Sequence, residues 1–418
     1  MRVICGYNVN IDAVHNISGG EKSRLIDEEC LTPRPKLPEK ISCLEDLLSA
    51  LLFCMKNGSG AELLIDNPET ADLIGKSFAW EFRLGGNAGN MANVLAGLGA
   101  EPVLNVPSLT SRQASFLHPG VKVAGNGSLK TARLSAKDGK DLTHFVFQFS
   151  AGEKVMTQEE TVVSPRENRF IASFDSLNRR LYADPDFNEY CQEHLEEMAG
   201  ALVSGFHMVT SPGLEEAIHQ RIAQIMSWKE RRPEIYIHCE MGSFQRPQIM
   251  GCLLERLAAG VDSIGMNEDE LAMLCSFERG RGGIMQAAGD LRSRLGIARV
   301  CIHTREYVVS AVRCLIKPEE EIFALEQGTG VAATLAATGN VRGTMPALGV
   351  NPAGASFVGD FCRDGAKRFG RGAYLIRGGD FLCLVPALDV VRPKMTVGLG
   401  DSMTAATFFH ELQARQGL

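Results

Sequence analysis

The chain has 418 residues, of which 45% are hydrophobic and 22% charged, and this composition excludes a disordered protein. Its formal net charge of −7 supplies no basic field of the kind that general nucleic-acid binders use, so we expect no nucleic-acid partner. No uncharged apolar run approaches the roughly 20 residues that a membrane helix needs, so we expect no membrane partner either.

The twelve cysteines are scattered from Cys5 to Cys383 without a C-x-x-C pair, which is typical of buried thiols in a reducing compartment. The first residues lack the apolar segment of a secretory signal. We therefore expect a soluble protein of the cytoplasm.

Short β-branched runs alternate with helical stretches along most of the chain, as in βαβ units around a parallel sheet. The predicted strands are residues 102–107, 201–210, 234–240, 261–266, 299–314 (a pair broken near Arg305) and 380–391. The predicted helices are residues 90–98, 214–230, 247–259, 271–275, 283–295 and 404–414.

Two segments have a different pattern. Residues 15–81 and 130–183 contain strand-like alternation, as at 143–149 and 170–174, without an obvious partner helix for each strand. We expect them to form a small discontinuous α+β lid domain. The remaining segments, 1–14, 82–129 and 184–418, would form a large α/β domain with a central, mostly parallel sheet flanked by helices.

The sequence TVGLGD, residues 396–401, directly precedes an apolar helix. Gly398 and Gly400 allow a tight turn with exposed amide groups, and the positive end of the helix dipole lies at the same place, which favours an anion. Asp401 stands where the helix begins. It is either the N-cap of that helix or a base that takes a proton from an attacking hydroxyl.

Two successive predicted strands end in acidic motifs, HCE at residues 238–240 and NEDE at residues 267–270. Alternation places His238 and Glu240 on one side of their strand, either in the core or at the mouth of the sheet, although a surface position for the Glu remains open. Asn267 fits a helix N-cap followed by acidic residues that complement the helix dipole.

Three acidic side chains are expected at one sheet edge. Glu240, Glu270 and Asp401 would emerge where parallel strands end, which is the edge at which such sheets bind ligands. Their oxygens are hard ligands suited to Mg²⁺ or another divalent cation, held partly through water.

The segment RLGGNAGNMAN, residues 83–93, combines three glycines with a following helix. The glycines allow a close backbone approach, and Asn87 offers amide groups to a polar ligand. The segment is neither a Walker A loop nor a dinucleotide fingerprint. A tight turn without a ligand is the alternative.

The first strand is predicted to end in the polar segment 6–12. Alternation would place Asn8, Asn10 and Asp12 on one face, where amides and a carboxylate suit the recognition of hydroxyl groups. A solvated edge face is the alternative.

Taken together, these motifs resemble those of the ADP-dependent sugar kinases, the archaeal-type glucokinase and phosphofructokinase branch of the ribokinase superfamily. The resemblance spans nearly the whole chain and includes SGFHM at residues 204–208 and NRF at residues 168–170. HCE, NEDE and GLGD match the family's HxE, NxxE and GxGD signatures. The resemblance implies a ribokinase-like large domain and a lid that covers the sugar site and excludes water on closure.

The activity implied by the resemblance is transfer of the β-phosphoryl group of ADP to a sugar hydroxyl, giving AMP, with Mg²⁺. Asp401 would be the base, and Gly398, Leu399 and Gly400 would supply the anion hole. Arg169 would neutralise phosphates, with Arg166 close enough to be confused with it. The implied binding residues form three groups, namely Asn10, Asp12, Gly86 and Asn87 for the sugar, Val397, Gly398, Leu399, Gly400 and Asn267 for the nucleotide, and Glu240, Glu270 and Asp401 for the metal.

Glu62 matches by position a Glu with which family glucokinases bind a sugar hydroxyl, where dedicated phosphofructokinases have a small residue. A carboxylate there favours an uncharged hexose and repels a 6-phosphate, unless cations such as Arg133, Lys140 and Arg169 offset it. Glucose, fructose 6-phosphate and both remain open as acceptors.

Two other functions remain open at this point. The residues do not distinguish ADP from ATP as the phosphoryl donor, so an ATP-dependent ribokinase-type kinase is one alternative. A sugar or nucleotide sensor without catalysis is the other, although a sensor has no need of three acidic residues at the site. The sequence does not predict the oligomeric state.

Overall fold

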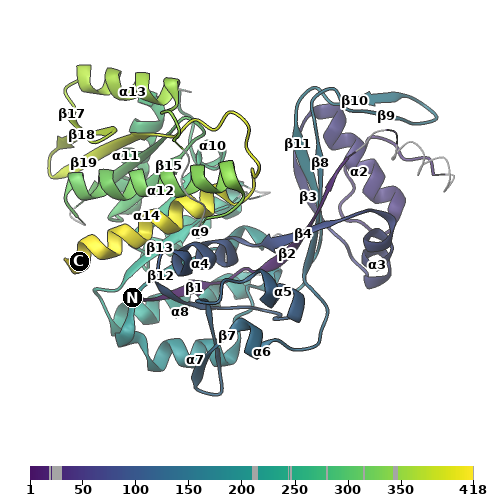
Figure 1. Cartoon of the computed structure of the whole chain (residues 1–418), viewed down its shortest axis with the longest axis horizontal. Coiled ribbons are helices and arrows are strands. Elements are labelled where there is room, and N and C mark those ends of the chain that lie inside the picture. Colours follow the sequence, from purple (N-terminus) through teal and green to yellow (C-terminus); the bar gives the residue numbers. More distant parts are fainter. Residues whose placement is uncertain are drawn as a thin grey trace. The chain divides into compact units, whose positions relative to one another are not determined.

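The structure is a computed structural model of the chain (Figure 1). It describes residues 1–17, 20, 31–209, 215–242, 244, 247–278, 281–313, 316–341 and 347–417. Some predicted positions lie outside these residues, namely Thr210, Leu214 and Cys314 in the predicted elements and Cys30 among the cysteines.

The chain divides into two compact units. Unit 1 comprises residues 1–9, 86–137 and 178–418, and unit 2 comprises residues 10–85 and 138–177. The divisions fall after residues 9, 85, 137 and 177, whereas the sequence patterns placed them after residues 14, 81, 129 and 183.

Unit 1 contains one twelve-stranded sheet in the order β17-β18-β19-β16-β15-β14-β13-β12-β1-β5-β6-β7. The strands from β6 to β15 in this order are parallel, and antiparallel strands extend both edges. This confirms the predicted α/β class. The strands are β1 (Arg2–Gly6), β5 (Glu101–Leu104), β6 (Lys122–Gly125), β7 (Ser128–Thr131), β12 (Met198–Val203), β13 (Tyr236–Glu240), β14 (Ser263–Asn267), β15 (Arg299–His303), β16 (Tyr307–Arg313), β17 (Lys367–Phe369), β18 (Gly372–Arg377) and β19 (Asp380–Pro386).

Helices flank this sheet, and the central strands are buried along their length, as is typical of parallel sheets covered by helices. The long helices α12 and α14 pack side by side (Figure 1). The helices are α4 (Asn87–Gly97), α5 (Ser111–Phe116), α6 (Ala132–Ser135), α7 (Pro185–Glu193), α8 (Glu215–Arg231), α9 (Pro247–Leu257), α10 (Glu268–Leu274), α11 (Arg281–Leu295), α12 (Pro318–Thr338), α13 (Pro352–Arg363) and α14 (Leu399–Gln416).

Several predicted elements of unit 1 differ in extent. The strand predicted at 201–210 ends at Val203, because Gly205 takes a left-handed φ of 93° and a short 3₁₀ helix, Phe206–Met208, follows. The strands predicted at 102–107 and 380–391 end at Leu104 and Pro386. Helices α5, α6, α7, α12 and α13 and strands β6, β7, β17 and β18 were not predicted.

Unit 2 contains a five-stranded sheet in the order β3-β11-β8-β2-β4 and a separate hairpin. Its helix α2 packs against β11, and the described part of this unit has fewer helices than strands, as the sequence pattern without a helix for each strand indicated. The apolar side of α2 joins an aromatic core that includes Phe78, Phe145, Phe147 and Phe170. The elements are β2 (Asn10–Asn16), α2 (Leu44–Asn57), β3 (Ala61–Leu64), α3 (Pro68–Ser77), β4 (Glu81–Gly85), β8 (Thr143–Phe149), β9 (Lys154–Met156), β10 (Thr161–Val163) and β11 (Asn168–Phe174).

The predicted single strand through residues 6–12 is wrong. β1 ends at Gly6 and β2 begins at Asn10, and the two strands belong to different sheets. Asn8 is buried in unit 1, whereas Asn10 and Asp12 share a face of β2 in unit 2, where the Asn10 amide donates to the Asp12 carboxylate at 2.7 Å. Alternation describes a local period and does not record where the chain leaves one sheet for another.

Within the described part of the chain, no helix combines the length and apolar character needed to cross a bilayer. The cysteines that the structure describes are all free thiols.

Candidate active site

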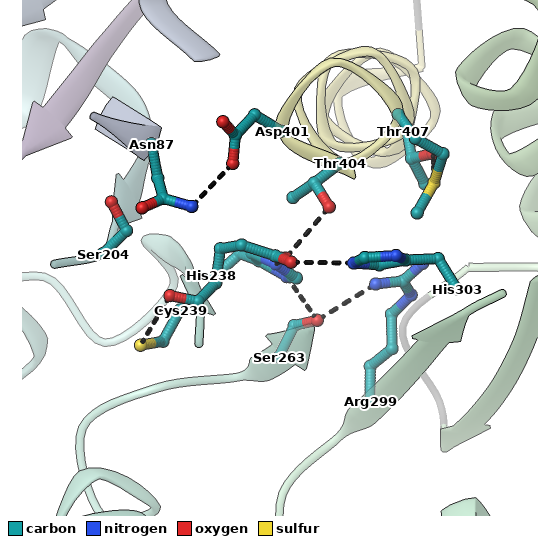
Figure 2. Close-up of polar contacts among 12 residues, drawn as sticks. Asn87, Ser204, His238, Cys239, Ser263, Arg299, His303, Asp401, Thr404 and Thr407 are labelled. Carbon is teal, nitrogen blue, oxygen red and sulfur yellow. Dashed lines mark hydrogen bonds and ion pairs between the residues drawn. The ribbon is translucent and has the colours of Figure 1, made fainter. Parts of the chain in front are cut away.

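Asp401 lies in the first turn of α14, and the N-cap of this helix is Gly398, with a φ of 73°. The interpretation of Asp401 as the cap is therefore wrong. Its two carboxylate oxygens accept hydrogen bonds from two amides of α4. One comes from Asn87 Nδ2 at 2.7 Å (Figure 2), and the other comes from Asn90 Nδ2 at 2.9 Å. Burial raises the pKa of this carboxyl above its ordinary value, and the two amide hydrogen bonds partly offset the shift.

A hydrogen-bond chain fixes which way the Asn87 amide faces. Ser204 Oγ donates to Asn8 Oδ1 at 3.0 Å, and Asn8 Nδ2 donates to Asn87 Oδ1 at 3.1 Å. Asn87 is thereby left with its amide hydrogens directed at Asp401. The sequence predicted Asn87 at the site but missed Asn90, which lies one helical turn further along the same face of α4.

Glycines are required at three positions around this carboxylate. Gly86 has a φ of 83°, and a side chain there would lie 2.5 Å from the Asn8 carbonyl oxygen. A Cβ on Gly398 would lie 3.2 Å from Asn90 Nδ2, and one on Gly400 would lie 2.9 Å from His303 Cε1. The turn Val397 to Gly400 therefore packs closely on its neighbours and begins α14, whose first amide groups have no partner inside the helix.

Glu240 ends β13 and is 5% exposed, so a surface position for this residue is wrong. Its Oε2 lies 3.2 Å from His238 Nε2 and accepts from Thr404 Oγ1 at 2.9 Å, while its Oε1 lies 3.0 Å from His303 Nε2. Burial alone would raise the pKa of Glu240, but the hydrogen bonds from the two histidines outweigh it and lower the pKa to about 2. Glu240 is an anion held by three donors.

Sequence reasoning missed His303 and Thr404. His303 is the last residue of β15, whose carboxyl end lies at the same edge as those of β13 and β14, so its position in the predicted sheet was the available signal. Thr404 follows Asp401 by three residues in α14, a spacing that places both on neighbouring parts of one helix face.

Asn267 and Glu270 form a capping box at the start of α10, as the predicted N-cap requires. Asn267 Oδ1 accepts from the backbone N–H of Glu270 at 2.8 Å, and Glu270 Oε2 accepts from the backbone N–H of Asn267 at 3.0 Å. Burial, together with the negative charges of Glu240 and Asp401, raises the pKa of Glu270 to about 7.

Glu240, Glu270 and Asp401 act on one another electrostatically, so the fold brings the three predicted acids to one edge of the sheet. Within the described ranges, no set of three or more His, Cys, Asp or Glu side chains is close enough to bind one ion directly. Repelling, buried carboxylates fit a divalent cation that keeps part of its water shell. A metal at this edge stays a prediction.

Unit 2 holds the other predicted polar residues around a buried histidine that sequence reasoning missed. His144 pairs with Asp12 in the register of β8 and β2, and its Nε2 lies 3.0 Å from Asp175 Oδ2 and its Nδ1 3.7 Å from Glu62 Oε1. Burial lowers the pKa of His144, but these carboxylates outweigh it and raise the pKa to about 9. His144 is therefore a cation at neutral pH, and Ser173 donates to Glu62 beside it.

The two candidate arginines of unit 2 have separate environments. Arg166 Nε donates to the Gly58 carbonyl at 2.7 Å and so fixes the turn after α2. Arg169 is exposed on β11, and its charge lowers the pKa of Asp12, which burial raises. Of the other cations, Lys140 lies in unit 2, whereas Arg133 lies in α6 of unit 1 rather than in a lid segment.

Comparison with protein families gives one match over most of the chain, to the conserved region described as ADP-specific phosphofructokinase/glucokinase, over residues 1–351. The chain belongs to the ADP-specific phosphofructokinase/glucokinase family. Membership confirms the resemblance seen in the sequence and identifies the protein as an ADP-dependent kinase with a sugar acceptor.

Individual members of the ADP-specific phosphofructokinase/glucokinase family are similar over nearly their whole length. The ADP-dependent glucose/glucosamine kinase of Pyrococcus abyssi is 29% identical, over 98% of this chain and 94% of that protein. The ADP-specific phosphofructokinase of Pyrococcus horikoshii is 28% identical, over 99% of this chain and 98% of that protein. A crystal structure of a hypothetical ADP-dependent phosphofructokinase from Pyrococcus horikoshii OT3 matches with a TM-score of 0.82 and 25% identity, over 100% of this chain and 98% of that one. Since both kinds of kinase are about equally similar, the family does not select the acceptor.

Proposed function

We propose that this protein transfers the β-phosphoryl group of ADP to a hydroxyl group of fructose 6-phosphate, glucose or both, releasing AMP, with Asp401 as general base. The observation that carries the proposal is the environment of Asp401. It is 8% exposed, two amides hold its oxygens, and it stands one residue after Gly400 at the start of a long helix. Burial raises the pKa of this carboxyl, which makes it a better proton acceptor than a surface aspartate.

The turn Val397 to Gly400 is proposed to hold the transferred phosphoryl group. Its amides at the start of α14 point hydrogen-bond donors and the positive end of the helix dipole at charge that develops during transfer. Arg169 is proposed to neutralise nucleotide phosphates, and Asn267 is proposed as a nucleotide contact.

A divalent cation, Mg²⁺ in the first place, is proposed at the edge formed by Glu240, Glu270 and Asp401. When bound, such a cation neutralises charge on the phosphates. Glu240 is suited to hold its water, because three donors fix its carboxylate as an anion. Glu270 is suited to respond to it, since a nearby cation lowers the pKa that burial has raised.

The sugar is proposed to bind the residues that the family resemblance assigns to it, namely Asn10, Asp12, Glu62, Gly86 and Asn87. The Asn10 and Asp12 side chains lie on one face of β2, where a carboxylate and an amide recognise hydroxyl groups. Glu62 favours an uncharged hexose, while the positive charge of His144 beside it reduces the repulsion of a phosphate. Both acceptors are therefore proposed.

Donor and acceptor profiling tests this function directly. The purified protein is incubated with ADP or ATP, with glucose or fructose 6-phosphate, and with or without Mg²⁺, and the nucleotide product is identified. Formation of AMP from ADP with at least one sugar supports the proposal. Turnover with ATP alone would show that the donor is that of a ribokinase-type kinase. Sugar binding without any nucleotide product would show a sensor. Either result would overturn the proposed function. A cytoplasmic location stays a prediction.

A further inference from the structure

Glu240 is the end nearest the proposed site of a buried chain of polar side chains that begins at Arg299, deep in unit 1. Arg299 Nη1 donates to Ser263 Oγ at 3.1 Å, Ser263 Oγ lies 2.8 Å from His238 Nδ1, and His238 Nε2 lies 3.2 Å from Glu240 Oε2. Ser263 is 0% exposed and Arg299 is 1% exposed. Figure 2 shows Arg299, Ser263 and His238 following one another along this path.

The chemistry of the two ends fixes the direction of every hydrogen bond. Glu240 is an anion, so a bare His238 Nε2 facing its oxygen would be repelled, and this nitrogen carries the hydrogen. Arg299 has no lone pair to offer, so Ser263 Oγ accepts from the guanidinium. The Ser263 hydrogen is then directed at His238 Nδ1, which is the acceptor in this pair.

Arg299 itself is fixed from the other side. Its Nε lies 2.9 Å from Glu321 Oε1 and 2.8 Å from Glu411 Oε1, and Tyr236 donates to Glu411 Oε2 at 2.8 Å. All four side chains are buried, so the position of the guanidinium is set by β13, β15, α12 and α14 together.

We propose that Ser263 and Arg299 are positioning residues for Glu240. They hold His238 as the tautomer with hydrogen on Nε2. This donor and Thr404, on the same oxygen, fix the orientation of the carboxylate that would hold the water of a bound cation. The inference deepens the proposed function, because it assigns residues that act on the metal-organising carboxylate without touching substrate. A hydrogen bond of this kind behind a metal ligand is typically worth about 10- to 100-fold in metal affinity or activity.

The test uses the full chain with ¹⁵N-labelled histidine, without substrate or metal, and reads the protonated nitrogen of His238 from long-range ¹H–¹⁵N correlations. The His238 signals are assigned by their loss in His238→Gln. We expect hydrogen on Nε2 and none on Nδ1 in the wild type. In Ser263→Ala we expect the Nδ1 resonance to move or the tautomer to become mixed. Hydrogen on Nδ1 of the wild type overturns the proposal.

Kinetics provide the second readout. Ser263→Ala is expected to lower kcat by roughly 10- to 100-fold and to raise the Mg²⁺ concentration needed for half-maximal activity, with the sugar KM nearly unchanged. Ser263→Thr, which restores the hydroxyl, is expected to recover most of the activity. Ser310→Ala is the matched control, because Ser310 is also fully buried in the same sheet but stands outside the chain.

Two results would contradict the positioning role. Either Ser263→Ala behaves like Ser310→Ala in both readouts, or Ser263→Thr fails to recover activity while it restores the wild-type His238 spectrum. If the wild type has no kinase activity with any donor and sugar, the proposed function is wrong. The tautomer measurement would still show whether the hydrogen bonds from Arg299 to Glu240 have the proposed directions.

Discussion

Asn90 Nδ2 donates a hydrogen bond to Asp401 Oδ2 across 2.9 Å and so joins α4 to the first turn of α14. Together with Asn87 on the other oxygen, it leaves the carboxylate buried, oriented and free of any role in capping its own helix. The proposed base is therefore held by side chains more than three hundred residues earlier in the chain.

Replacing the base tests this arrangement most directly. Asp401→Asn is expected to lower kcat by roughly 10² to 10⁴, the range over which a general base contributes to rate, with little loss of fold. Steady-state kinetics and thermal unfolding would be compared with those of Asp269→Asn, which removes an exposed acid from the first turn of α10. Near-normal turnover of Asp401→Asn would refute the role of Asp401 as base.

Removing one amide donor is expected to change the pH profile. The Asn90 hydrogen bond lowers the pKa of Asp401, so Asn90→Ala raises that pKa and moves the acidic limb of the kcat profile to higher pH. Asn93→Ala is the matched control, since Asn93 lies in the same helix but bonds to the backbone of Phe116 and His118. An acidic limb that moves equally in both variants would show that Asn90 acts only through the stability of α4.

Gly398, the N-cap of α14, is expected to be needed for nucleotide binding as well as for the left-handed backbone conformation. Gly398→Ala and Gly417→Ala both place a side chain at a left-handed residue, with φ of 73° and 68°, and each is expected to lower the free energy of unfolding by about 1–2 kcal/mol. A Cβ meets Asn90 only at Gly398, since nothing lies within 4 Å at Gly417. We therefore expect Gly398→Ala alone to weaken nucleotide binding, measured by calorimetry. Equal nucleotide affinity in both variants would argue against a phosphate site at this turn.

Stability is expected to depend on pH through Glu411. Burial raises the pKa of this carboxyl from its ordinary value of 4.5 to about 8 in the folded protein. Such a group contributes stability that is fully present below the unfolded pKa and is lost as the pH rises through the folded pKa. Glu411→Gln does not lose stability in this way. The free energy of unfolding of the variant should therefore rise relative to that of the wild type as the pH increases from about 4.5 to about 8.

Denaturant unfolding at pH 5, 7 and 9 measures this difference in the free energy of unfolding. Glu230→Gln, at an exposed position in α8, controls for the change in net charge. A constant difference between Glu411→Gln and the wild type over this range would contradict the assignment.

The acceptor is expected to depend on Glu62. Glu62→Ala removes a carboxylate that we propose binds a neutral sugar and repels a phosphate, so we expect kcat/KM to fall for glucose and to hold or rise for fructose 6-phosphate. Glu81→Ala, which removes an exposed carboxylate from β4 of the same unit, is the control. An unchanged ratio of the two sugars would discard the role of Glu62 in specificity.

The sequence by itself determined the features that neighbouring residues decide. The capping box of Asn267 and Glu270 lies within four residues, and most strands and helices of unit 1 follow from local periodicity and from the glycines that end them. The motifs HCE, NEDE and GLGD, together with their order along the chain, were also sufficient to recognise the family. Even the common edge of the three acids followed, since parallel strands end on one side of a sheet.

Only the tertiary structure decided which side chains complete the site. Asn90, His303 and Thr404 hold the two central carboxylates, and nothing in their immediate neighbours marks them, because their partners are far away in the chain. The same reason explains why Asn8 and Asn10 were wrongly placed on one face. A period of two residues is set by the backbone of each strand, whereas the sheet that a strand joins and the donors that reach a buried carboxylate depend on long-range packing.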